Sequence, residues 1–144
     1  MVSPRSITIA ALLVGIVAPA GACTSSQGHG PTPAVSHLAG ADNGRTLTVA
    51  VGDRVQVVLA STYWSFVPLP DGSVLRLDGS PRTFPQFSHC VPGEGCGTVS
   101  ATFTALAAGT VAVAATRTSC GEALACAPDQ RNFRVVVEVH QPTA

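Results

Sequence analysis

Apolar side chains recur at every second position in several segments of this chain, and this alternation constrains the fold more than any other feature. A period of two places every second side chain on one face of a β-strand. Helical spacing does not persist after Thr46, and Gly and Pro interrupt the pattern at intervals suited to turns. We therefore predict an all-β fold, with two packed antiparallel sheets and Greek-key connections. The alternating residues are Leu47, Val49, Val51, Val55, Val57, Leu59, Val99, Ala101, Phe103, Val111, Val113, Ala115, Phe133, Val135, Val137 and Val139.

Residues 61–98 break this regularity, because prolines recur there and prevent long central strands. Only Ser73–Leu77 is predicted to form a strand in this stretch, which also holds the sole tyrosine and the sole tryptophan, Tyr63 and Trp64. A long irregular segment rich in apolar residues is typical of an ordered functional loop. The alternative is that its aromatic side chains cap one end of the core: Trp64, Phe66, Phe84 and Phe87.

The N-terminal segment is predicted to be a lipoprotein-type signal peptide over residues 1–22. Arg5 precedes an apolar run, residues 7–18, that is interrupted only by Thr8. The run is shorter than the ~20 residues that span a bilayer, and small residues of the kind that a signal peptidase accepts follow it. An uncleaved N-terminal membrane anchor is the alternative.

Cys23 follows Ala20-Gly21-Ala22, a pattern that resembles a bacterial lipobox, in which the cysteine is acylated and becomes the mature N-terminus. The position three before that cysteine is usually leucine, and here it is Ala20. Residues 23–37, rich in Ser, Thr, Pro and Gly, are predicted to form a flexible tether, and residues 38–144 the folded domain. The protein is expected to be exported and lipid-anchored, at the outer face of the cytoplasmic membrane or in the cell envelope.

The chain has five cysteines, and the odd one in an exported protein needs an explanation. Acylation of Cys23 leaves two pairs of equal spacing, Cys90 with Cys96 and Cys120 with Cys126. Three connectivities are possible, and we predict local pairing within each short loop. Disulfides are favoured over a four-cysteine metal site, because zinc ligands usually lie closer together in the chain. No metal is therefore expected.

The charge balance argues against a nucleic-acid partner. Eight basic residues, all arginine, equal eight acidic ones, so there is no net positive charge to attract phosphate groups. The sequence contains no G-x-S-x-G, H-E-x-x-H or Walker motif, and His89 beside Cys90 would point to the opposite face of an extended chain. We therefore expect neither an enzyme nor a cofactor.

The order of elements resembles the chagasin-like inhibitors of papain-type cysteine peptidases. The resemblance covers roughly residues 46–139 and rests on a V-G-D turn at 51–53, an F-x-A-L-x-x-G turn at 103–109 and a final strand at 133–137. It implies an immunoglobulin-like sandwich whose three adjacent loops enter the peptidase cleft.

The same resemblance implies which loops meet the partner. Ser61-Thr62-Tyr63-Trp64 stands where the family carries N-P-T-T-G-Y, and Gly93-Glu94-Gly95-Cys96 where it carries G-x-G-G. Arg117-Thr118-Ser119 stands where it carries R-P-W, with only the arginine retained. The implied partner-binding residues are Thr62, Tyr63, Trp64, Gly93, Gly95 and Arg117.

These observations favour a monomeric binding module with a protein partner, and the resemblance implies that the partner is a papain-type cysteine peptidase. The alternative is a structural or assembly lipoprotein of the cell envelope, which a flat and featureless loop end would favour. An enzyme is the third hypothesis and would require a concave pocket with convergent polar groups.

Overall fold

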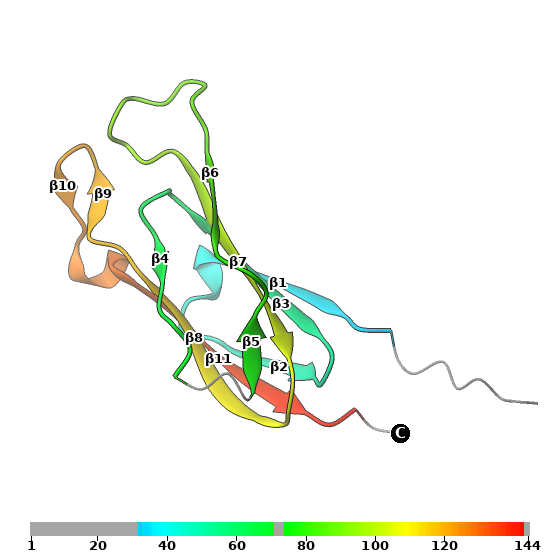
Figure 1. Ribbon diagram of the computed structural model, residues 1–144. Coiled ribbons are helices and arrows are strands. Elements are labelled where there is room, and N and C mark those ends of the chain that lie inside the picture. The colour runs from blue at the N-terminus through cyan, green and yellow to red at the C-terminus, as the bar shows by residue number, and fades with distance from the viewer. Residues whose placement is uncertain (1–31, 71–73, 143–144) are drawn as a thin grey trace, which may run out of the picture.

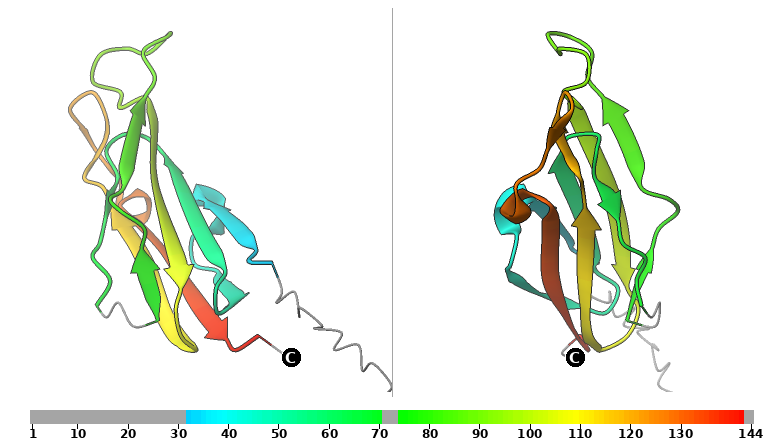
Figure 2. Two further views of the ribbon diagram at one scale, coloured as in Figure 1. Left: turned by 45° about the vertical axis from the view of Figure 1, so that its right-hand side comes forward. Right: turned by 90° about the vertical axis from the view of Figure 1, so that its left-hand side faces the viewer.

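Two β-sheets pack face to face in the computed structural model, which describes residues 32–70 and 74–142 (Figures 1 and 2). The first sheet has the strand order β1-β3-β7-β5, and β6 also pairs with β7: β1 (Val35–Ala39), β3 (Arg54–Ala60), β5 (Leu75–Leu77), β6 (Arg82–Pro85) and β7 (Gly97–Ala105). The second has the order β2-β11-β8-β4: β2 (Thr46–Ala50), β4 (Ser65–Phe66), β8 (Gly109–Thr116) and β11 (Asn132–His140). A small hairpin and two short 3-10 turns complete the fold: β9 (Ser119–Gly121), β10 (Leu124–Ala125), η1 (Gly40–Asp42) and η2 (Pro128–Gln130). The predicted all-β sandwich is confirmed.

The alternating apolar residues form the core between the two sheets. Along β3 the pattern places Val55, Val57 and Leu59 inside, each fully buried, and the residues between them point outward. Val135 of β11 lies opposite Val113 of β8, and both are buried. Full burial of such a side chain contributes about 1.5–3 kcal/mol, so this interior supplies most of the stability that holds the loops in place.

Two edge strands pair in parallel, which differs from the fully antiparallel sheets that the alternation predicted. β1 runs parallel to β3 in one sheet, and β2 runs parallel to β11 in the other. The chain changes sheets between them through η1 and residues 43–45, where Gly44 has a φ of 82°. Because each half of this segment joins a different sheet, neither forms a hairpin with the other.

Asp42 closes the turn at this crossing. Its carboxylate accepts a hydrogen bond from the Ala39 N–H at 2.8 Å and another from the Arg45 guanidinium at 2.8 Å. The hydrogen bond from Ala39 lowers the pKa of the Asp42 carboxyl; desolvation opposes that effect and Arg45 reinforces it. The turn is therefore held most firmly while Asp42 is ionised.

Regular structure begins earlier than the boundary at Leu38 that we expected. β1 starts at Val35, and the Ala34 N–H donates to Asp53 Oδ1 at 2.8 Å. The sequence did not predict this strand, because only one of its side chains, Leu38, is buried and no alternating apolar pattern is therefore visible. Residues 1–31, with the expected signal segment and Cys23, lie outside the described residues.

Residues 61–98 contain more strand than the single one predicted. β5 begins at Leu75, and Ser73 lies outside the described residues; β4 and β6 are additional. Both additional strands are short and lie at sheet edges. Pro85 is tolerated at the end of β6 because an edge strand does not need every backbone N–H for the hydrogen-bond ladder. No helix in residues 32–70 or 74–142 has the length and apolar character to cross a membrane.

Candidate binding site at the loop end

Three segments lie together at one end of the sandwich, opposite the end that carries the C-terminus (Figure 1). They are residues 61–64 between β3 and β4, residues 86–96 between β6 and β7, and residues 117–131 between β8 and β11. We call this region the loop end. All of the partner-binding residues implied by the family resemblance lie within it.

Backbone hydrogen bonds join the first loop to the second. The N–H groups of Ser61 and Thr62 donate to the carbonyl oxygens of Gly97 and Gly95, each at 2.8 Å. The Tyr63 hydroxyl donates to the carbonyl oxygen of Gly93. Tyr63 is therefore a positioning residue that connects the two loops.

Gly95 is required by this contact. Its φ is +66°, and a Cβ atom placed on it would lie 2.4 Å from Cε2 of Tyr63. No real Cβ atom approaches a ring so closely, so the tyrosine ring packs directly on the bare backbone. Residues that are far apart in the sequence thus form one rigid unit.

Gly93 connects this unit to the third segment. A Cβ atom at Gly93 would lie 3.1 Å from Cγ of Glu122, which lies between β9 and β10. The three segments therefore touch in series. We call these three linked segments, which project from one end of the sandwich, the ridge.

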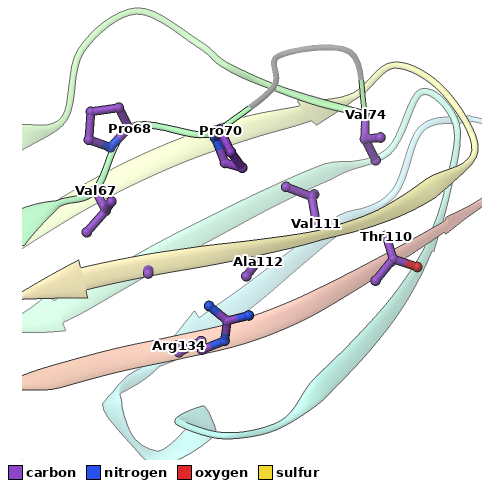
Figure 3. Close-up of a pocket in the computed structure, with 9 residues that line it drawn as sticks. Val67, Pro68, Pro70, Val74, Thr110, Val111, Ala112 and Arg134 are labelled. Carbon is purple, nitrogen blue, oxygen red and sulfur yellow. The ribbon is translucent and has the colours of Figure 1, made fainter.

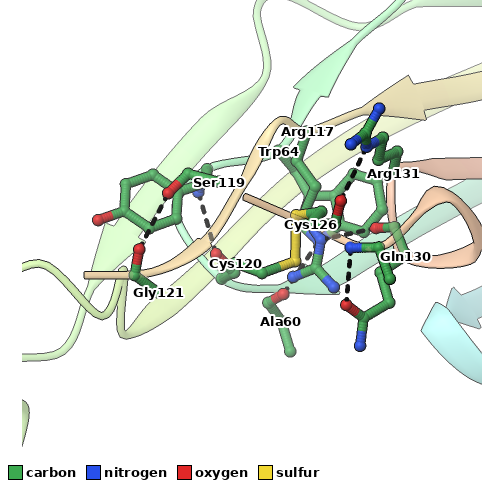
Figure 4. The surroundings of a disulfide bond; sticks show 12 residues. Ala60, Trp64, Arg117, Ser119, Cys120, Gly121, Cys126, Gln130 and Arg131 are labelled. Atoms are coloured by element: carbon green, nitrogen blue, oxygen red, sulfur yellow. Dashed lines mark hydrogen bonds between the residues drawn. A yellow bond between two sulfur atoms is a disulfide. The ribbon is translucent and has the colours of Figure 1, made fainter. Parts of the chain in front are cut away.

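Two disulfides close the second and third segments, and the predicted local pairing is confirmed. Cys90 is bonded to Cys96 with a Cα–Cα separation of 5.9 Å, and Cys120 to Cys126 with one of 4.9 Å (Figure 4). Glu94 lies close to the first pair, but a sulfur bonded to another sulfur is not the thiolate that a metal would need. The bridges restrict the loop shapes.

Trp64 packs onto the body of the sandwich. It is half-buried against the core cluster, and its indole Nε1–H donates to the Ala60 carbonyl oxygen at 3.0 Å. The Arg117 guanidinium carbon lies 4.5 Å from the centroid of the indole ring, and Arg117 Nε–H donates to the Gln130 carbonyl oxygen at 2.9 Å (Figure 4). Trp64 and Arg117 thereby attach the third segment to the scaffold.

The four aromatic residues that the sequence suggested as caps of the core fall into two groups. Phe66 forms an edge-to-face pair with Phe103 of the core, with ring centroids 6.2 Å apart, so it and Trp64 contact the interior. Phe84 and Phe87 are solvent-exposed, and the exposed fraction of Phe87 is 85%. The capping hypothesis is wrong for these last two residues.

Sequence reasoning missed two of the apolar side chains that project from the loop end. Val91, inside the first disulfide loop, is 51% exposed, and Leu124, beside the second, is 63% exposed. Their only signal in the sequence is a position within a short cystine loop, where an apolar side chain has no core to enter.

Two surface hollows outside the loop end each contain a single charged residue. One of 490 Å³ lies along the outer side of β8 (Figure 3), and Arg134 is its only charged residue. Another of 460 Å³ lies between β4 and β5, and Arg76 is its only charged residue. Neither contains a residue implied by the family resemblance. The loop end is therefore a better candidate site than either of these two hollows.

No protein-family model and no curated protein matches this chain. Solved structures do resemble it. The cysteine protease inhibitor EhICP2 from Entamoeba histolytica superposes with a TM-score of 0.55 at 16% identity, over 77% of this chain and 100% of that one. The structure of amebosin superposes with a TM-score of 0.48 at 19% identity, over 76% of this chain and 100% of that one. The superposition on EhICP2 shows that the two chains share a fold, the immunoglobulin-like sandwich expected from the resemblance to the chagasin-like proteins.

Proposed function

We propose that this protein is an exported, lipid-anchored binding module whose loop end enters the cleft of a papain-type cysteine peptidase and blocks it. The observation that carries the proposal is the mutual support of the three segments. Tyr63 is seated on Gly95, and Gly93 on Glu122. A ridge built in this way presents a defined shape to a partner.

The physical basis of such inhibition is preorganisation. Loops that are already ordered lose little conformational entropy on docking, so more of the contact energy appears as affinity. Cys90–Cys96 and Cys120–Cys126 close the two loops that project furthest. A rigid ridge can occlude a cleft without taking part in any chemistry.

Inhibition is tested with the full chain and an active-site-titrated papain-type peptidase. We expect reversible loss of activity with excess protein, and none with a serine peptidase as control. The protein should also fail to bind a peptidase whose cleft is filled by a covalent peptide-like blocker. Full peptidase activity in the presence of excess protein would overturn the proposed function.

The membrane attachment is tested separately. Eleven residues, 24–34, separate Cys23 from β1. We expect a diacylglyceryl-modified Cys23 by intact mass, and loss of detergent partitioning in Cys23→Ser. An unmodified N-terminus elsewhere in residues 24–34 would contradict the anchor.

A further inference from the structure

The tip of the loop end has a distinctive chemistry, which we define by five exposed residues and call the apical surface. Phe87 and Val91 come from the second loop, and Leu124 from the β9–β10 hairpin. Glu94 and Glu122 are the exposed carboxylates between them along the chain. The surface is thus apolar and acidic.

Glu94 and Glu122 belong to segments that touch, although the two residues come from different loops. Gly93, the neighbour of Glu94, packs against the Glu122 side chain. The ion pairs that the described residues form all lie elsewhere, on Asp42 and Asp78. Glu94 and Glu122 are exposed, and neither forms one of these ion pairs.

Basic residues are excluded from the same region. Residues 86–96 and 118–130 contain no arginine or lysine, whereas the chain as a whole is neutral. Arg117 and Arg131, at the base of the third segment, are engaged with Trp64 and with the backbone carbonyls of Gln130 and Cys126. The charge of the apical surface is therefore uniformly negative.

From these exposed apolar side chains and negative charges we infer that the apical surface selects a partner whose cleft combines an apolar subsite with basic groups at its rim. The inference rests on the proposed function and adds the kind of peptidase that is chosen. The exposed apolar side chains gain affinity by entering the subsite, since they lose water contact only in the complex. Glu94 and Glu122 attract the basic rim during approach and penalise an acidic one.

The experiment compares two papain-type peptidases, one with a basic cleft rim and one with an acidic rim. Full-length wild-type protein is tested beside E94Q/E122Q, which removes both charges, and E138Q, a matched control on β11 outside the loop end. We expect wild type and E138Q to inhibit the basic-rimmed enzyme at least about tenfold more strongly. E94Q/E122Q should lose most of that preference.

Ionic strength and the V91S variant separate the electrostatic contribution to inhibition from the apolar one. Raising the ionic strength to about 0.5 M should weaken wild-type inhibition of the basic-rimmed enzyme and leave E94Q/E122Q nearly unchanged. V91S should weaken inhibition of both enzymes by a similar factor. Equal inhibition of both by wild type, without salt dependence, would overturn the charge selection and leave the proposed function standing. Inhibition of neither would overturn the proposed function and this inference together.

Discussion

The contact between Tyr63 and Gly95 is the clearest single-residue constraint in the loop end. Gly95→Ala adds a methyl group against the tyrosine ring at a φ of +66°, whereas Gly44→Ala adds one in open space at a φ of +82°. We expect a loss of about 1 kcal/mol for Gly44→Ala and about 2–4 kcal/mol for Gly95→Ala. Chemical denaturation measures both. Equal losses would mean that the ring moves aside freely.

Trp64 is expected to act mainly through stability. Trp64→Ala removes a half-buried indole, its hydrogen bond to Ala60 and the Arg117 contact, and should cost about 3 kcal/mol. Phe87→Ala, at an 85% exposed position, should change stability by less than about 0.5 kcal/mol. Thermal melts of the two variants test this. A wild-type melting temperature for Trp64→Ala would instead indicate a residue free to bind a partner.

Asp42 makes stability depend on pH at the acid end. Because the folded state lowers the pKa of this carboxyl below 3.8, its contribution is present above that value. The contribution disappears as the pH falls through the lower folded-state pKa. Asp42→Asn should therefore reduce the melting temperature near neutral pH, and its difference from wild type should shrink as the pH falls through the lowered folded-state pKa. A difference between the two proteins that stays constant with pH would argue against this role, and Asp129→Asn in η2 serves as the control.

At the scale of elements, the two cystine loops have different surroundings. Cys90 and Cys96 are partly exposed, whereas Cys126 is 2% exposed beneath the third segment. Closing a loop this short contributes roughly 2 kcal/mol in the chain-entropy model. C90A/C96A should therefore lower stability by about that amount, and C120A/C126A by more, because it also leaves a cavity.

Under the proposed function, the affinity for a peptidase would distinguish the roles of these loops further. The first disulfide fixes the backbone that carries Gly93 and Gly95, on which Tyr63 and Glu122 rest. We expect C90A/C96A to weaken inhibition at temperatures where the domain remains fully folded. Inhibition constants measured well below the melting temperature provide the readout, and an unchanged constant would show that the loop keeps its shape without the bridge.

On the scale of the whole molecule, the first strand completes the sandwich. β1 covers the edge of β3, buries Leu38 and brings the Ala34 N–H to Asp53. A fragment of residues 38–144 loses that hydrogen bond and much of the β1 ladder, whereas residues 32–144 keep both. At about 0.5–1.5 kcal/mol per hydrogen bond, the shorter fragment should be less stable by roughly 1–4 kcal/mol. Equal denaturation midpoints would show that β1 contributes little.

Local sequence determined the strands of the core and the pairing of the cysteines. The alternation through Val55, Val57 and Leu59 is a property of consecutive residues, and any sheet that buries one face must use it. Cys90 and Cys96 are six residues apart, so the chain itself keeps them close. Both features follow from short-range geometry.

Tertiary structure decided the features that join distant residues. The division of residues 35–50 between two sheets depends on strand edges supplied by β3 and β11, which no local pattern identifies. The sequence likewise could not predict that Phe87 is exposed and Trp64 half-buried, because an aromatic side chain is equally apolar in either place. The contact of Tyr63 with Gly95 exists only once β3 and β7 are paired, since that pairing brings the two loops to the same end of the molecule.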